Sequence, residues 1–309
     1  MRFIHRGWRY AKRYSRRSMQ KRSVERKFAP LVPESLVVDV GASHFPHVPW
    51  SLFREASKSH WILIDPNESS LEYVDRWGHP SSASKVPYAV AGRDGDMKLF
   101  ATHVPTGSSS YEPVIPESMR DRLGPDAQKY FFPVTVREVP ARSLPSILAP
   151  FDRAQPCVVK LDTQGSEVDI LRPLESWLTA GRIVGVELEA SLLAVPIYSG
   201  SPRFWQAQEW MESLGFELLR LNVIEAPVEG TFRNSRSYPH ECDAVFALRP
   251  DVASRLPTPA RALLLAFYVA NQLYGEALRM LETDRALSAN LIADYADVDE
   301  LQAVLKRQL

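Results

Sequence analysis

Short runs of apolar residues alternate with amphipathic segments through the centre of the chain. The apolar runs are continuous, as is typical of strands covered on both faces of a parallel sheet: SLVVDV, HWILI, CVVKL and RIVGVEL. Segments with helical spacing follow them: WSLFREASK, PNESSLEYVDRWG, SEVDILRPLESWL and RFWQAQEWMESLG. This alternation predicts an α/β fold with a doubly wound, mostly parallel sheet, which binds ligands at the carboxyl ends of its strands.

The remaining strand patterns complete the predicted sheet. KVPYAVAG is expected to form a third strand, with Pro87 at an edge or early position, and GDMKLFAT is expected to pair with it. FPVTVREV alternates and predicts a further strand. FELLRLNVI and CDAVFALR, joined by a variable loop instead of a helix, predict an antiparallel pair on the far side of the sheet. Residues 102–130, rich in Ser, Pro and Gly, form a long excursion of the kind that is functional or disordered.

Three regions are expected: a basic arm at 1–30, the α/β domain at 31–250 and a helical extension at 251–309. The extension carries one apolar stripe with spacings of three or four, made of Leu263, Phe267, Ala270, Tyr274, Leu278 and Leu281. Thr258 is placed to cap that helix, and a second helix is expected from Asn290 to Leu305. These helices are expected either to cover the body of the protein or to form a homodimer.

Charge is unevenly distributed along the 309 residues, although the formal net charge is zero. Residues 1–27 hold eleven of the 37 Lys and Arg but one of the 37 Asp and Glu, so the rest is acidic. We interpret this arm as a solvated N-terminus that can be removed without loss of the fold. Its alternation of Arg with Trp and Tyr leaves open an anionic partner, such as nucleic acid.

The sequence gives no sign of a membrane-spanning or secreted protein. Its longest apolar run, ALLLAFYVA at 262–270, is less than half of the roughly 20 residues that a spanning helix needs. No apolar signal-peptide core follows the first residues. Cys157 and Cys242 are expected to be buried core thiols, which fits a reducing cytoplasm.

Two predicted strands end in a carboxylate next to a turn. The first, VVDVGAS, carries Asp39 and then Gly41, where glycine lets the backbone approach a ligand closely. The second, LIDPN, ends at Asp65, which either accepts the two ribose hydroxyls of an adenosine group or caps the next helix. The first turn lacks the G-x-G-x-x-G pattern that seats a pyrophosphate. S-adenosylmethionine is an adenosine ligand without a pyrophosphate.

Several motifs together form a pattern known from one enzyme family. They are DVGAS at 39–43, DP at 65–66, GSSS at 107–110, KLDTQGSEVDIL at 160–171, the run from VELEAS to GFELL at 186–219, and CDAVFAL at 242–248. The chain in this way resembles the FkbM-type family of S-adenosylmethionine-dependent methyltransferases over about residues 36–250. Position 45 is Phe where the family often has a second glycine. The resemblance implies a class I methyltransferase, Rossmann-like fold.

The resemblance also implies roles for the site residues. S-adenosylmethionine is expected to bind Asp39, Gly41, Ala42, Ser43, Asp65 and Asp162. Asp162 either holds the amino group of the cofactor or takes the proton of the acceptor hydroxyl. Glu187 is the second catalytic candidate. It shares a strand face with Glu189, and either carboxylate could face the acceptor.

The other polar residues of this region have structural alternatives. Glu167 is expected to cap or pair within the fold, and Gly165 to admit a close backbone approach. Lys160 is equally suited to a buried salt bridge and to a catalytic role. His44 and His47 flank the first turn without a third ligand at suitable spacing, so no metal is expected.

The predicted function is O-methylation of a hydroxyl on a small polar acceptor, such as a sugar within a glycan, an acceptor class that comes from the resemblance. Two alternatives stay open. One is an RNA methyltransferase that uses the basic arm. The other, motivated by Phe45, is a non-catalytic module that keeps the fold but has lost the cofactor.

Overall fold

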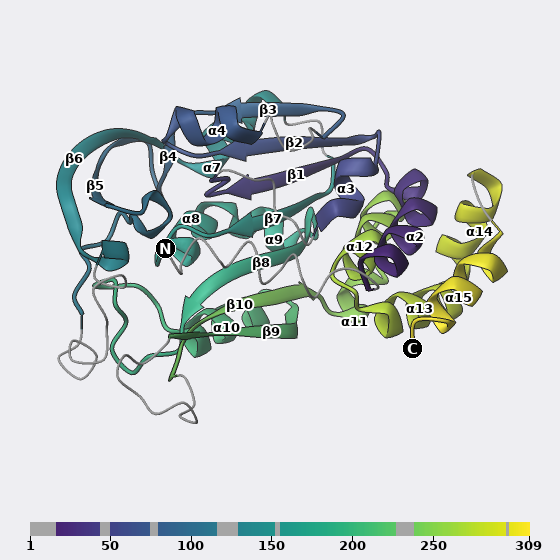
Figure 1. Ribbon diagram of the computed structural model, residues 1–309. Helices are drawn as coiled ribbons and strands as arrows, with labels where there is room; N and C mark the ends of the chain where they lie inside the picture. The colour runs from purple at the N-terminus through teal and green to yellow at the C-terminus, as the bar shows by residue number, and fades with distance from the viewer. Residues whose placement is uncertain are drawn as a thin grey trace.

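A sheet of seven strands forms the centre of the molecule (Figure 1). The computed structural model describes residues 17–43, 50–74, 80–115, 129–151, 155–226, 238–294 and 297–309. The strands, in their order across the sheet, are β3 (Ala83–Val86), β2 (Ser59–Ile64), β1 (Ser35–Val40), β7 (Cys157–Leu161), β8 (Ile183–Ser191), β10 (Tyr238–Leu248) and β9 (Phe216–Ala226).

Strand directions confirm the predicted doubly wound sheet. The neighbours from β3 to β8 are parallel, whereas β10 runs antiparallel to both β8 and β9. Every residue of β1 and β7 is buried, because these central strands are covered on both faces. Cys157 and Cys242 are free, buried thiols, as expected.

A smaller sheet lies near the carboxyl ends of β1 and β7 (Figure 1). It contains β4 (Ala89–Val90), β6 (Pro133–Arg142) and β5 (Gly95–Thr102), in the order β4-β6-β5. The expectation that GDMKLFAT pairs with the third strand was wrong, because β5 pairs with β6. The third strand itself divides at Pro87, which has no N–H to continue the ladder, and the chain passes there from one sheet to the other.

Helices connect the strands of the main sheet. Their bounds are α3 (Ser51–Glu55), α4 (Glu68–Val74), α7 (Leu144–Leu148), α8 (Glu167–Leu171), α9 (Glu175–Thr179), α10 (Phe204–Ser213) and α11 (Pro250–Ala253). Short 3-10 turns lie at 29–31, 105–107, 149–151 and 172–174. Gly215 follows α10 with φ +92°, the left-handed conformation that commonly ends a helix and that glycine adopts readily.

The C-terminal extension is helical, as predicted, but it is divided into four helices instead of two. It forms α12 (Thr258–Ala270), α13 (Tyr274–Thr283), α14 (Arg285–Asp294) and α15 (Val298–Lys306). The expected continuous stripe helix ends after Ala270, where Asn271 is buried and Gln272 has φ +60°. The second expected helix is likewise two helices. Thr258 opens α12 without acting as its cap, since the N-cap position is Pro257 and no side chain bonds there.

The N-terminal arm also needs a correction. Residues 17–28 form α2 (Arg17–Phe28), which packs on α3, α12 and α15 (Figure 1). Val24 and Phe28 are 0% and 1% exposed, and Lys21 forms a buried ion pair with Glu25 at 3.3 Å. The interpretation of the arm as solvated was therefore wrong for this helix. Residues 1–16 lie outside the described part of the chain.

In the part of the chain that the structure describes, no helix is both long and apolar enough to cross a bilayer.

Candidate functional site

Charged residues lie in a row across the three central strands. Strand register pairs Asp39 of β1 with Lys160 of β7, and Lys160 with Glu187 of β8. Paired residues of neighbouring strands share a face of the sheet. All three are buried, at 0%, 8% and 4% exposure. Asp162 lies one row further towards the carboxyl ends, so these four charged residues lie near the edge where ligands bind.

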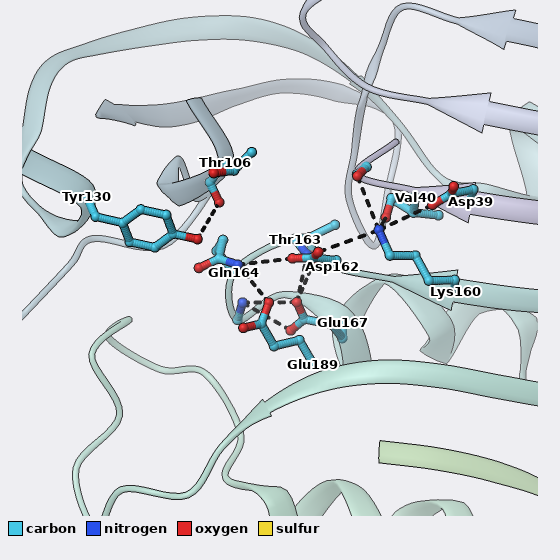
Figure 2. A network of polar contacts seen from close by, with 12 residues as sticks. Asp39, Val40, Thr106, Tyr130, Lys160, Asp162, Thr163, Gln164, Glu167 and Glu189 are labelled. Atoms are coloured by element: carbon cyan, nitrogen blue, oxygen red, sulfur yellow. Dashed lines mark hydrogen bonds and ion pairs between the residues drawn. The ribbon is translucent and has the colours of Figure 1, made fainter. Parts of the chain in front are cut away.

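The ammonium of Lys160 contacts both the turn that follows β1 and Asp162, the residue that follows β7 (Figure 2). Its Nζ lies 3.2 Å from Asp39 Oδ1 and 3.6 Å from Asp162 Oδ2, and it donates to the Gly41 carbonyl at 3.2 Å. Burial alone would lower the pKa of Lys160, but the charges of Asp39 and Asp162 outweigh it and raise that pKa. The ammonium is therefore charged at physiological pH. The predicted buried salt bridge is confirmed.

Gly41 holds the first turn against Asp162. It has φ +77°, and a Cβ at this position would lie 2.1 Å from the Asp162 carbonyl oxygen. The N–H of Asp162 donates to the Val40 carbonyl at 3.1 Å, and the N–H groups of Gly41 and Ala42 donate to the Ile64 carbonyl. The glycine thus serves a close approach between two parts of the chain, and any larger residue would separate them.

The other residues of the first turn are placed as far as Ser43. Ala42 is fully buried, and the Ser43 hydroxyl lies 3.4 Å from that of Ser70 in α4. The predictions for His44, Phe45 and His47 fall outside the described residues. In the described ranges, no three His, Cys, Asp or Glu side chains are arranged to hold a metal ion.

Asp65 follows β2, at the strand end next to the Gly41 turn. The residue is 8% exposed, and its carboxylate accepts the N–H of Asn67 at 2.8 Å, a turn contact just before the first residue of α4, so the expected helix cap is replaced by a bond outside the helix. Burial raises its pKa to about 6, against the opposing effects of the Asn67 N–H and of Lys160. Its predicted bond to a ribose is compatible with this position and stays a prediction.

Gln164 connects two carboxylates that lie on different strands (Figure 2). Its Nε2 donates to Asp162 Oδ1 at 3.0 Å and to Glu189 Oε2 at 2.7 Å. Its Oε1 accepts the hydroxyl of Tyr198 at 2.8 Å, and its carbonyl accepts that of Ser109 at 2.7 Å. The residue is 4% exposed and has φ +60°, a conformation unusual for a residue with a side chain. Sequence analysis missed this residue.

Glu167 organises the turn that carries Gln164. Its carboxylate accepts the N–H of Thr163 at 2.8 Å and that of Gly165 at 3.0 Å. Burial raises its pKa to about 7, against these hydrogen bonds. The structural alternative for Glu167 is therefore confirmed. A Cβ on Gly165 would lie 2.9 Å from the Cβ of Ser201, so glycine lets the segment around Ser201 pack over the turn.

Glu187 and Glu189 have different surroundings although they share a strand face. Glu187 accepts the indole N–H of Trp50 at 3.1 Å and lies 3.9 Å from Arg220. Glu189 lies one row nearer the carboxyl edge and bonds Gln164 beside Asp162. Burial, followed by the charge of Asp162, raises the pKa of Glu189 well above its usual range. The structure thus brings Glu189 to Asp162, and it surrounds Glu187 with Trp50 and Arg220.

An aromatic and aliphatic cluster covers this edge of the sheet. It contains Ile115, Phe131, Leu193, Ile197 and Tyr198, with Tyr111 and Tyr130 packed against it. The hydroxyl of Tyr130 donates to the Thr106 carbonyl at 2.9 Å, and burial raises the pKa of this hydroxyl, as do the charges of Glu189, Glu241 and Asp162. The described part of the excursion at 102–130 therefore forms a wall of the site. Residues 116–128 of the excursion are outside the described ranges.

Comparison with known proteins gives one family and several distant folds. The sequence model of the family "Methyltransferase FkbM domain" matches residues 39–218. Comparison with curated protein sequences gives no match.

Among solved structures, a Listeria monocytogenes protein assigned as an S-adenosylmethionine-dependent methyltransferase is 10% identical, with a TM-score of 0.34. The alignment covers 75% of this chain and 99% of that protein. LepI in complex with S-adenosylmethionine is 14% identical, with a TM-score of 0.30, and the alignment covers 70% of this chain and 43% of LepI. A methyltransferase of Leishmania major is 10% identical, with a TM-score of 0.29 and coverages of 70% and 66%.

Proposed function

Because this chain belongs to the FkbM methyltransferase family, whose sequence model matches more than half of it, we propose that it is an O-methyltransferase of a small polar acceptor. The family assignment confirms the predicted methyltransferase and its class I, Rossmann-like fold. It also supports S-adenosylmethionine as the methyl donor. The proposal adds that the methylated atom is a hydroxyl oxygen, for example of a sugar within a glycan.

The residues at the ends of β1, β2 and β7 fit the chemistry of that donor. Asp65 offers a carboxylate for ribose hydroxyls, and Asp162 offers one for an amino group, next to the tight turn at Gly41. Asp39 acts through Lys160, which its charge holds in place. Ala42 and Ser43 supply the backbone of the same turn. When bound, S-adenosylmethionine supplies an electrophilic methyl group on a sulfonium.

Asp162 is proposed to receive the proton that the acceptor hydroxyl loses, and Glu189 beside it, whose raised pKa favours the neutral form, is proposed to help position Asp162. The side chain of Asp162 is 44% exposed, so an acceptor can reach it, whereas that of Lys160 beside it is buried. Gln164 fixes both carboxylates through one amide, which removes rotational freedom before the reaction. This bridge, next to the Gly41 turn, is the observation that carries the proposal. Glu187, held by Trp50 and Arg220, is assigned a supporting role in the same charged row.

The alternatives are weaker on the same observations. An RNA acceptor would bring phosphates to an edge that carries Asp162, Glu189 and Glu241, which repel anions. A non-catalytic module is at odds with the family assignment. A cytoplasmic location, a homodimer through the C-terminal helices and an anionic partner of the arm stay predictions.

Mass spectrometry of the natively purified full chain tests the proposed function. We expect S-adenosylmethionine or S-adenosylhomocysteine to copurify, and a methyl group to appear on hydroxylated small molecules from a cell extract. Calorimetric titration with S-adenosylmethionine that gives no heat and no thermal shift would contradict it. Methylation of RNA alone would select the RNA alternative.

A further inference from the structure

A small pocket lies beside Gln164, and Asp162 does not belong to its lining. Its volume is about 20 Å³, and its lining includes Gln164, Glu189, Tyr198, Ser201 and Glu241. One water-sized group needs roughly 10–15 Å³ on this measure. The pocket therefore accommodates one such group next to the candidate site.

Ser201 gives an independent sign that this pocket holds a ligand. The residue is 8% exposed, and its buried hydroxyl oxygen has no hydrogen-bond partner among the residues that the structure describes. A buried polar group in this state is costly, and native proteins rarely leave one unsatisfied. A ligand that donates a hydrogen bond to Ser201 would remove this cost.

Acidic residues line the pocket. Glu189 and Glu241 both belong to the lining, and Glu241 lies 3.1 Å from the Nε2 of His240. Burial raises the pKa of Glu189, and the charges of Asp162 and Glu241 raise it further, which favours its neutral form, whereas a bound cation would favour its carboxylate. Glu167 also lines the pocket, but its carboxylate already accepts the N–H groups of its own turn. The pocket accordingly suits a cation.

We propose that this pocket binds the primary ammonium group of the acceptor, so that the acceptor is an amino sugar or another hydroxylated amine. An ammonium has three N–H donors and is the size of one water, and the pocket offers Glu189, Glu241 and Ser201 as acceptors. The ring of Tyr198 adds an aromatic surface suited to a cation. With the ammonium held there, a hydroxyl of the same molecule lies towards Asp162. This inference rests on the proposed function for its link to methyl transfer.

Methylammonium chloride is a probe that tests the pocket without knowledge of the acceptor skeleton. The melting temperature of the full chain is measured in methylammonium, sodium, potassium and tetramethylammonium chloride at equal ionic strength. We expect methylammonium alone to raise it, by about 2 °C near saturation, because only it has the size and the donors for the pocket. Equal shifts in all four salts, or a shift with sodium or potassium alone, would overturn the proposal.

Variants locate the effect. Ser201→Ala and Glu241→Gln are expected to abolish the methylammonium shift, while Glu225→Gln, at an exposed position of the same β9–β10 pair, retains it. Retention of the shift in Ser201→Ala and Glu241→Gln would also overturn the proposal. Titration with S-adenosylmethionine is run in parallel. If the wild-type protein shows the methylammonium shift but does not bind S-adenosylmethionine, the proposed function is overturned and the ammonium pocket is retained.

Discussion

Lys21 and Lys160 are almost equally buried, at 7% and 8% exposure, yet their pKa values shift in opposite directions. Burial lowers the pKa of Lys21, and its partner Glu25 does not offset this. For Lys160 the carboxylates of Asp39 and Asp162 outweigh the burial and raise the pKa. The difference shows that one carboxylate within α2 does not compensate the burial of Lys21, whereas two carboxylates at the strand ends more than compensate the burial of Lys160.

These two regions also lie apart in the molecule. Helix α2 packs with α3, α12 and α15, whereas β7, which carries Lys160 as its second-last residue, ends towards the side of the small sheet (Figure 1). The first region should therefore govern stability and the second should govern cofactor binding and turnover. Substitutions in the two regions should therefore differ in their effects on stability, cofactor affinity and turnover.

The largest expected effect is on turnover in Asp162→Asn. The substitution is nearly isosteric but removes the proton acceptor, so we expect a loss of about a hundred- to ten-thousandfold. The formation of S-adenosylhomocysteine, with a small-molecule extract as acceptor pool, measures it. The melting temperature should change little. Unchanged turnover would place Asp162 outside the reaction.

The next largest effect is on the free energy of unfolding, which should fall more in Lys160→Met than in Lys21→Met. Removing Lys160 leaves buried Asp39 without its charge partner, and we expect a loss of about 3–5 kcal/mol in the free energy of unfolding. Lys21→Met should cost less, because Glu25 keeps the Ser51 hydroxyl at 2.8 Å. Denaturant unfolding of both variants checks this. Equal losses would show that the two ion pairs do not differ as described.

Phe28→Ala is expected to act on stability alone. The side chain is 1% exposed within the core, and its removal should cost about 3–5 kcal/mol. Cofactor affinity should stay within error of the wild type. Deletion of residues 1–16 is the matched control and should leave the melting temperature unchanged. An unchanged free energy of unfolding in Phe28→Ala would contradict the docking of α2. A large fall in melting temperature on deletion of residues 1–16 would show that the stabilising contacts do not come from α2 alone.

The raised pKa of Asp65 predicts a pH dependence. An Asp in the unfolded chain titrates near 3.9, whereas Asp65 titrates at about 6 in the folded protein. Between about pH 4 and 6 the folded state binds the additional proton, so the contribution of Asp65 to stability falls as pH rises through this window. The difference is about 3 kcal/mol above pH 6. Unfolding of wild type and Asp65→Asn across this range should show it, and parallel curves would contradict it.

The sequence predicted those parts of the fold that depend on local pattern. Continuous apolar runs gave the order of elements, and strand ends placed Asp39, Asp65 and Asp162 together. Lys160 was left between two interpretations, because a sequence does not state what lies across a strand. The structure decides this by register.

What the sequence did not predict depends on backbone conformation or on long-range packing. Gln164 bonds both Asp162 and Glu189 from a backbone conformation with φ +60°, and no pattern of residues in the sequence predicts this conformation. Helix α2 carries few apolar residues, so its docking depends on the complementary surface of α12. Glu187 and Glu189 are two residues apart and lie on the same face of β8, so the alternation of side chains along the strand cannot show which of them is nearer to Asp162.

The most direct test of the account is the affinity of Asp65→Ala for S-adenosylmethionine. A carboxylate that accepts ribose hydroxyls contributes roughly 1.5–3 kcal/mol in each charge-assisted bond. We therefore predict about ten- to a hundredfold weaker binding by calorimetric titration, at about 1.4 kcal/mol per tenfold. Melting curves of the same samples report the loss of the hydrogen bond from the Asn67 N–H. An unchanged affinity together with a lowered melting temperature would give Asp65 only a structural role in this turn and contradict the placement of the cofactor at these strand ends.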